Sequence, residues 1–209
     1  MRLFDFHRAP NPRRVRIFIA EKGIEVPLVN VNLFQMEQLT PEFRAINPGG
    51  TVPVLETDDG LYITECIAIC RYLETLHPEP CLFGKGASAE AQVLMWNGII
   101  EHEGFHAVAE MLRNWSPGFR NRVFPGPQDI AQMPELIERG RKRSAQFFDR
   151  CEQRLLDSQF IAGDRFSVAD IALLTLVDFS DWVELDVRAS RPDLDRWYQG
   201  VSGRPSMGA

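Results

Sequence analysis

The chain has 209 residues, of which 44% are hydrophobic and 25% charged, as is typical of a globular protein with room for one or two domains. Its net charge of −6 argues against nucleic acid as the main partner, because phosphate binding requires a basic surface. No apolar run approaches the length of a membrane span and the first residues contain no apolar signal region, so we expect no membrane partner and a cytoplasmic location.

The first elements of the chain alternate between strand and helix. Residues 2–6 alternate in character and are predicted to form a short strand. Residues 9–12, Ala-Pro-Asn-Pro, form a turn, and Pro12 suits the first position of a helix that ends at Gly23. Residues 26–33 form a second strand, which the intervening helix makes parallel to the first.

A turn rich in Pro and Gly then leads into a strand that contains a proline. Residues 35–38 are predicted to be a loop, and a short helix begins at Thr40. The turn at residues 47–50 precedes the apolar run Val52-Pro53-Val54-Leu55, where the proline indicates an edge strand or a kink. A cis Val52–Pro53 bond would turn the carbonyl and amide of Val52 away from the sheet and leave them free for a ligand.

A hairpin and a helix follow this strand. Residues 58–60 form a turn, residues 61–63 a short strand, and Glu65 opens a helix that ends near Leu76. The amides at that helix start are unpaired and lie at the positive end of the helix dipole, so they suit a carboxylate. Residues 78–87, with two prolines and two glycines, are predicted to be a linker.

The remainder of the chain is predicted to be helical. One long helix spans about residues 88–114, and a loop follows that includes Pro125, Gly126 and Pro127. Further helices are predicted over residues 136–156, from about 168 to 179, and from 192 to 201. The third of these four begins with a capping box, in which Ser167 and Asp170 bond reciprocally.

The four cysteines, Cys66, Cys70, Cys81 and Cys151, contain no C-x-x-C pair and no spacing with histidine that is typical of a metal site. We therefore expect no metal and no dithiol centre, and most of these thiols are predicted to pack as small apolar groups. Cys66 leaves two interpretations open, because a thiol at a helix start can also have a lowered pKa and be reactive.

Two spaced motifs carry a family resemblance. Asn47-Pro48-x-Gly50-x-Val52-Pro53-x-Leu55 and Thr64-Glu65-x-x-Ala68-Ile69-x-x-Tyr72-Leu73 resemble the glutathione-binding half of cytosolic glutathione transferases. The similarity extends from Leu3 to Leu76 and resumes over residues 160–171. Residues 9–16, Ala-Pro-Asn-Pro-Arg-Arg-Val-Arg, are most similar to a fungal and bacterial subgroup.

The resemblance implies an α/β thioredoxin-like domain at residues 1–77, which binds glutathione, and a linker at 78–87. An all-α helical domain at residues 88–209 would form the cosubstrate side of a cleft between the two domains. The family also implies a homodimer, in which the first domain packs on the helical half of the partner subunit. Aromatic residues of both halves would line the cosubstrate pocket, and the candidates are Phe6, His7, Trp115 and Phe119.

The same resemblance assigns the glutathione contacts. Glu65 would accept from the glutathione ammonium, and the amides of Glu65 and Cys66 would bind the γ-glutamyl carboxylate. Val52, before Pro53, would pair with the cysteinyl backbone as in strand addition. Gln38 falls where relatives bind the glycyl carboxylate, whereas Thr51 stands where several relatives carry a lysine. The alternative for Glu65 is a helix-dipole residue that contacts no ligand.

The residue that activates the glutathione thiol is the least defined. Ala9 stands where related classes carry Ser, Thr or Cys, and it has no donor to offer the sulfur. Asn11 is the predicted replacement, although it can equally be a turn residue between two prolines. A further route uses helix-start amides and a water held by polar residues of the helical half, with candidates His106, Arg113, Asn114 and Ser116.

The predicted function is conjugation of the glutathione thiolate to small hydrophobic electrophiles, with glutathione as cosubstrate. One alternative is a glutathione-dependent peroxidase or disulfide reductase, which a reactive Cys66 would favour. Another is a non-catalytic module that binds glutathione and mediates interactions, which Ala9 and the missing lysine would favour.

Overall fold

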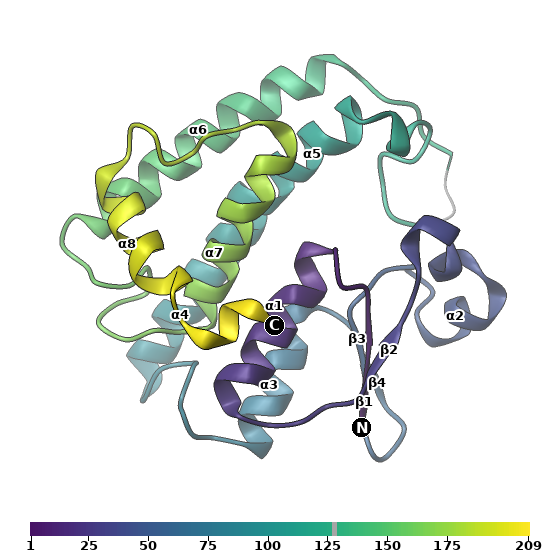
Figure 1. Cartoon of the computed structure of the whole chain (residues 1–209), viewed down its shortest axis with the longest axis horizontal. Coiled ribbons are helices and arrows are strands. Elements are labelled where there is room, and N and C mark those ends of the chain that lie inside the picture. The colour runs from purple at the N-terminus through teal and green to yellow at the C-terminus, as the bar shows by residue number, and fades with distance from the viewer. Residues whose placement is uncertain (127–128) are drawn as a thin grey trace.

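The computed structural model describes residues 1–126 and 129–209, so Pro127 of the predicted loop lies outside the described residues. Figure 1 shows two parts, a small sheet with its helices near the N-terminus and a larger helical bundle. The C-terminus returns to the side of α1 (Pro10–Lys22), where the two parts meet. This arrangement confirms the predicted α/β half followed by an all-helical half.

The sheet has four strands in the order β2-β1-β3-β4. β1 (Arg2–Asp5) pairs in parallel with β2 (Leu28–Asn30) and antiparallel with β3 (Val54–Glu56), which pairs antiparallel with β4 (Tyr62–Ile63). The predicted parallel pairing of the first two strands is confirmed. The second strand is shorter than predicted, because Asn32 caps a 3-10 turn at Leu33–Gln35 instead of extending the ladder.

Each face of the sheet contributes to a different core. Leu3 and Leu55 belong to the main core with buried side chains of α1 and α3 (Cys66–Leu76). Phe4 and Val54 point to the opposite face, where they pack with Phe43 of α2 (Pro41–Ile46). Because side chains alternate across a strand, a stretch of only four residues in β1 serves both cores.

Two local predictions were wrong by a few residues. The first helix begins at Pro10 rather than Pro12, because Ala9 is the extended residue that precedes it. Residues 35–38 are not an irregular loop, since a second 3-10 turn covers Glu37–Leu39 after the first. The helix ends as predicted at Gly23, whose φ of 62° is the left-handed conformation that glycine adopts without a steric cost.

The predicted long helix is interrupted by a change of winding. It consists of α4 (Ala87–Ile99), a π-helical segment (Ile100–Phe105) and α5 (His106–Trp115). Gly104 lies in the wider turn, where an added Cβ would overlap the Leu176 side chain and lie 2.9 Å from Phe147. The close approach of two neighbouring helices explains why glycine occupies this position.

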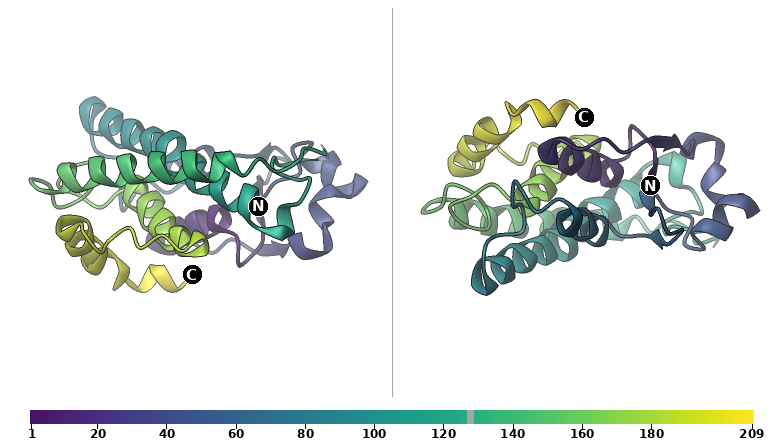
Figure 2. Two further views of the ribbon diagram at one scale, coloured as in Figure 1. Left: turned by 90° about the horizontal axis from the view of Figure 1, so that it is seen from above. Right: turned by 90° about the horizontal axis from the view of Figure 1, so that it is seen from below.

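Three further helices complete the bundle, α6 (Glu135–Leu155), α7 (Val168–Ser180) and α8 (Pro192–Ser202). Figure 2 shows α7 between α4 and α8, and nearly all of its side chains are buried. The predicted capping box at Ser167 and Asp170 is confirmed, and Asp170 also accepts from the Trp197 indole at 2.9 Å. No helix of the described residues is long and apolar enough to cross a membrane.

Candidate active site

The turn before β3 presents a backbone that is free to bind. The Val52–Pro53 peptide bond is cis, as the sequence suggested. Asn47 holds the preceding turn, since its side-chain amide donates to the Thr51 carbonyl at 2.9 Å and its oxygen accepts from Gly49 at 3.0 Å. Within the described part of the chain, neither the N–H nor the carbonyl of Val52 has a hydrogen-bond partner. Val52 is itself buried, so both groups keep unused hydrogen-bonding capacity that suits an extended peptide.

Glu65 lies at the N-terminal end of α3 in a conformation that few residues adopt. Its φ is 66° and its ψ 121°, and it is the residue that precedes the helix. Such a backbone costs about 1–3 kcal/mol in a residue with a Cβ, so neighbouring structure must hold it in place. Its side chain is exposed and contacts no hydrogen-bond partner among the described residues. The carboxylate is thus presented to solvent beside the open helix end.

Cys66 packs as a buried group that links the two helix starts. Its Sγ donates to the Asn11 carbonyl at 3.3 Å, which brings the starts of α3 and α1 together. Burial raises the pKa of the Cys66 thiol to about 12, and the nearby Arg14 lowers it only in part. The thiol is therefore protonated near neutral pH, which favours the packing interpretation over a reactive thiolate.

Asn11 is the second residue of α1, and it is exposed. Its side-chain oxygen accepts from Arg14 at 3.3 Å. The first turn of this helix has an unusual donor set, because Pro10 and Pro12 have no N–H and the N–H of Arg13 donates to Ala9 at 3.3 Å. Asn11 therefore carries the one unpaired backbone N–H of that turn among the described residues.

Arg14, which the sequence analysis did not single out, fixes the helix start against the helical half. Its guanidinium is buried, forms an ion pair with Glu101, donates to Asn97 at 3.4 Å and lies over the Phe105 ring at 4.8 Å. The one signal in the sequence is the cluster of Arg13, Arg14 and Arg16 in a single predicted helix. That cluster does not indicate which residues the arginines contact.

Gln38 lies beside the turn that precedes Val52. An added Cβ on Gly50 would be 3.1 Å from the Gln38 carbonyl, so the two segments are in contact. The side-chain nitrogen of Gln38 lies 3.9 Å from the Met36 sulfur, while its oxygen is buried without a partner in the described structure. The structure thus brings Asn11 together with Cys66, and Gln38 together with the Gly50 turn.

The polar side chains of the helical half that were predicted to hold a water differ in how many hydrogen bonds they already make. Asn114 is engaged in holding the chain, since it donates to Glu110 and accepts from Met133, each at 2.8 Å. His106 is exposed, with its ring 5.5 Å from that of His102. Arg113 lies 5.0 Å from the centre of the Phe119 ring. We therefore remove Asn114 from the candidates that could hold a water.

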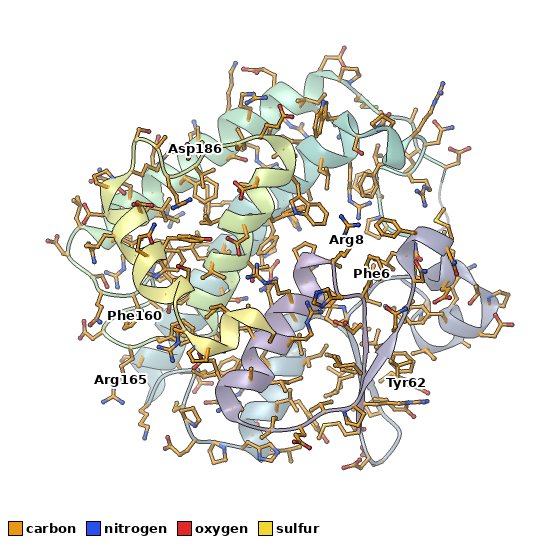
Figure 3. The ribbon with its side chains drawn as sticks, in the orientation of Figure 1. Phe6, Arg8, Tyr62, Phe160, Arg165 and Asp186 are labelled. Carbon is orange, nitrogen blue, oxygen red and sulfur yellow. The ribbon has the colours of Figure 1, made fainter. Side chains whose placement is uncertain are left out.

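Aromatic side chains form close contacts in each of the two parts. Phe6 contacts Phe34 edge to face at 5.2 Å, and Arg8 covers the Phe34 ring at 5.4 Å. Figure 3 shows Phe6 and Arg8 together, after β1 and below the end of α5. In the helical half, Phe179 packs against Trp182 with ring centres 5.5 Å apart.

Two surface hollows lie elsewhere. The larger, of about 470 Å³, is lined by residues from Asp186 to Asp195, where Arg188 and Asp195 pair at 2.6 Å and neutralise each other. The smaller, of about 190 Å³, lies between Met111 and Val183. None of the predicted glutathione contacts lines either hollow, and the candidate site is defined instead by the Val52 backbone and the two helix ends. Among the described residues, no group of His, Cys, Asp or Glu could hold a metal ion.

A thioredoxin-like half with a cis-proline strand and an open helix end, followed by a helical half, is the architecture of glutathione transferases. The chain matches the family described as "Glutathione S-transferase, N-terminal domain" over residues 9–76. It matches "Glutathione S-transferase, C-terminal domain" over residues 120–205.

Whole-chain comparisons agree with this. The chain is 35% identical to Glutathione S-transferase 2 of Saccharomyces cerevisiae, over 99% of this chain and 88% of the relative. Identity to Glutathione S-transferase F11 of Arabidopsis thaliana is 31%, over 95% of this chain and 91% of that relative.

Solved structures give the same result. The structure of Gtt2 from Saccharomyces cerevisiae superposes with a TM-score of 0.91 at 35% identity, covering 100% of this chain and 99% of that one. A glutathione S-transferase domain-containing protein of Marinobacter aquaeolei VT8 also has a TM-score of 0.91, at 33% identity, over 99% of this chain and 100% of its own. The chain therefore belongs to the glutathione S-transferase family, as its motifs predicted.

Proposed function

We propose that the protein is a glutathione transferase that conjugates the glutathione thiolate to small hydrophobic electrophiles. One observation carries the proposal. The Cys66–Asn11 contact joins the open end of α3, which presents Glu65, to the open end of α1, which presents the unpaired N–H of Asn11. A ligand that spans these two helix ends meets both an acceptor for its ammonium and a donor for its sulfur.

The binding mode follows from these groups. The ammonium of the γ-glutamyl end pairs with the exposed Glu65 carboxylate, and its own carboxylate accepts from the amides at the start of α3. The cysteinyl unit pairs with the N–H and carbonyl of Val52, which have no hydrogen-bond partner among the described residues. These contacts hold the tripeptide extended, with its sulfur toward the start of α1.

Activation of the thiol requires a lower thiol pKa, because only the thiolate is a strong nucleophile. Ala9 offers no donor, so we assign the role to Asn11, through its backbone N–H and its side-chain amide. Donors aimed at the sulfur stabilise the thiolate relative to the thiol. A water between the sulfur and polar side chains of the helical half is a second donor that the same cleft can hold.

The electrophile is proposed to bind between the two parts of the chain. We assign the apolar surface that contacts it to the exposed rings of Phe34 and Trp182 and to the half-buried rings of Phe6 and Phe119. Holding thiolate and electrophile together supplies the proximity that accelerates a bimolecular reaction. Aromatic walls favour small hydrophobic electrophiles over charged ones.

The proposal also covers the subgroup, the cellular location, the biological role and the oligomeric state of the protein. We place the chain in the fungal and bacterial subgroup with the residue 9–16 motif, in the cytoplasm, with a role in detoxification. We also propose a symmetric homodimer, which the exposed apolar side chains Leu61, Leu94 and Met95 support. Light scattering after gel filtration measures the dimer directly.

The alternative functions receive less support. A glutathione-dependent peroxidase or disulfide reductase would need a reactive thiol, and the buried Cys66 lacks that character. A non-catalytic glutathione-binding module remains the second candidate, because Ala9 is inert. It predicts retention on immobilised glutathione without turnover of an aryl halide.

The test combines calorimetry with an aryl halide assay on the wild type and on Asn11→Ala. We expect millimolar or tighter glutathione binding, turnover in the wild type, and a loss of turnover with binding retained in Asn11→Ala. The matched control is Gln199→Ala, an exposed amide residue on α8. No heat of glutathione binding in the wild type would overturn the proposal. Unchanged turnover in Asn11→Ala would remove the Asn11 side chain from the mechanism and leave activation to the backbone N–H at this position or to a water.

A further inference from the structure

Two arginines, one in α5 and one in the segment that follows it, have no acidic partner among the residues that the structure describes. Arg113 lies in the last turn of α5 and Arg122 in the segment that follows. Most arginines of the chain's interior pair with a carboxylate, as Arg14 does with Glu101 and Arg16 with Asp5. Of the carboxylates that the structure describes, none lies within ion-pair distance of Arg113 or Arg122. Such a pair of cations is suited to an external anion.

The local fold holds Arg113 and Arg122 in contact with each other. Arg113 donates to the Arg122 carbonyl at 3.3 Å, and Arg122 donates to the Gly118 carbonyl at 2.6 Å. Burial lowers the pKa of the Arg113 guanidinium, and the charge of Arg122 lowers it further. Like charges in a partly buried site repel each other, and a bound anion would relieve that repulsion.

The segment carrying Arg122 crosses from the helical half onto the thioredoxin-like half. Arg122 contacts the sulfur of Met36, which also lies 3.9 Å from the side-chain nitrogen of Gln38. An added Cβ on Gly50 would lie 3.7 Å from the Cα of Gly126. Figure 1 shows this segment beside the helical turns that precede α2. Arg122 and the side-chain amide nitrogen of Gln38 therefore meet at the Met36 sulfur, and the segment that carries Arg122 approaches the turn that leads to Val52.

The direction of the bound peptide locates its last carboxylate. If the γ-glutamyl end lies at the start of α3 and the cysteinyl unit at Val52, the glycyl unit continues away from α3 toward the Gly50 turn. That turn is in contact with Gln38 and with the crossing segment. A thioether is only a weak acceptor, so a carboxylate would readily replace Met36 as the partner of Arg122.

We propose that Arg122, with Arg113 behind it, binds the glycyl carboxylate of glutathione together with the amide of Gln38. This inference rests on the proposed function and deepens it. It supplies the positive charge that Thr51, in place of a lysine, does not provide. The charge comes from the helical half, so ligand binding ties the two halves together across the site. The planar guanidinium fork suits a carboxylate better than an ammonium does.

The test uses three thiols that differ only at this end, namely glutathione, its glycyl monoethyl ester and γ-glutamylcysteine. Calorimetry measures the affinity of the wild type, Arg122→Gln and Arg122→Lys for each. For glutathione we expect about a tenfold loss in Arg122→Gln, with a weaker salt dependence because the charge is gone, and a smaller loss in Arg122→Lys, which keeps the charge and the salt dependence. The ester and the dipeptide should bind all variants alike, because they lack the glycyl carboxylate.

The matched control is Arg120→Gln, an exposed arginine of the same segment, which should bind glutathione as the wild type does. An equal loss for all three thiols would overturn the inference, because it would show a general disturbance of the site. Unchanged glutathione affinity with a raised KM for a carboxylate-bearing electrophile would also overturn it and would assign the arginines to the cosubstrate. Wild type that binds none of the thiols would overturn the proposed function as well.

Discussion

Arg204 and Glu21 form a two-pronged ion pair between the C-terminal segment and α1, with both nitrogen-to-oxygen distances at 2.7 Å. Arg204 also lies 4.1 Å from the centre of the Phe166 ring, and Ser206 donates to the same carboxylate. The pair therefore fastens the end of the chain to the helix whose N-terminal residues form the proposed site.

Removal of this fastening should destabilise the fold moderately. Arg204→Ala is expected to lower the free energy of unfolding by about 1–2 kcal/mol, because a bidentate charged contact is lost from a partly exposed site. Arg204→Lys should recover only part of the loss, since an ammonium cannot make both contacts in the same plane. Urea titration followed by circular dichroism measures both, with Arg165→Ala, an exposed arginine, as control. Equal stability of Arg204→Ala and wild type would contradict this.

The same pair predicts a pH dependence. Burial raises the pKa of the Glu21 carboxyl, but the hydrogen bonds from Arg204 and Ser206 outweigh it, so the pKa is lowered overall. A carboxyl with a lowered folded-state pKa contributes stability above its unfolded pKa, roughly 4.3, and that contribution is lost as the pH falls through the folded-state pKa. The difference between wild type and Arg204→Ala should therefore be constant from pH 7 to 6 and shrink below about pH 4. Urea titrations from pH 7 to below pH 4 measure this difference in unfolding free energy. A difference that stayed constant in acid would refute the lowered pKa of Glu21.

The cysteines should differ in their reactivity. Burial raises the pKa of the Cys66 thiol to about 12, and it also raises the pKa values of Cys70 and Cys151. Cys81 is only half-buried. Iodoacetamide at pH 8 should therefore modify Cys81 first and the other three only after unfolding, as peptide mass spectrometry can show. Rapid modification of Cys66 in the folded protein would revive the disulfide reductase alternative.

Gly104 should not tolerate a side chain. Gly104→Ala places a Cβ against Leu176 and 2.9 Å from Phe147, so we expect a loss of about 1–3 kcal/mol of unfolding free energy. Gly98→Ala, in α4, is a matched control, because nothing lies within 4 Å of the added Cβ there. That control should be neutral or stabilising by up to about 1 kcal/mol. Thermal melts of the two variants compare them directly, and similar melting temperatures would contradict the close approach.

The elements that the sequence predicted well have local causes. A helix between two strands makes the strands parallel, Gly23 ends a helix, and the capping box at Ser167 and Asp170 begins one. The π-helical segment around Gly104 had no such signal, because it follows from the approach of α6 and α7. The start of α1 was misplaced because either Pro10 or Pro12 suits a first helical turn.

The site was predictable to the extent that its chemistry resides in the backbone. The Val52–Pro53 bond and the helix end at Glu65 are readable from one short stretch of sequence. The contacts of Arg14 and Arg122 are not, because their partners Glu101 and Met36 lie far away in the chain. Similarly, a helix-end thiol suggests reactivity until the burial of Cys66 is known.

Glu65 should show a conflict between stability and binding. Its φ of 66° is unfavourable for a residue with a Cβ, and glycine adopts it without that cost. Glu65→Gly is therefore expected to raise the free energy of unfolding by up to about 1 kcal/mol, and it removes the carboxylate proposed to pair with the glutathione ammonium. Glutathione affinity should fall by about tenfold or more, measured by calorimetry beside urea titration.

Glu184 offers the matched control, because it also has a positive φ, of 57°, and is exposed after the 3-10 turn Asp181–Val183. Glu184→Gly should stabilise the protein without any change in glutathione affinity, since it relieves the same kind of backbone cost away from the predicted contacts. If Glu65→Gly instead bound glutathione as tightly as wild type, the Glu65 carboxylate would serve only to complement the dipole of α3 and would not contact the ligand. Binding would then depend on the backbone of Val52 and on the amides at the start of α3.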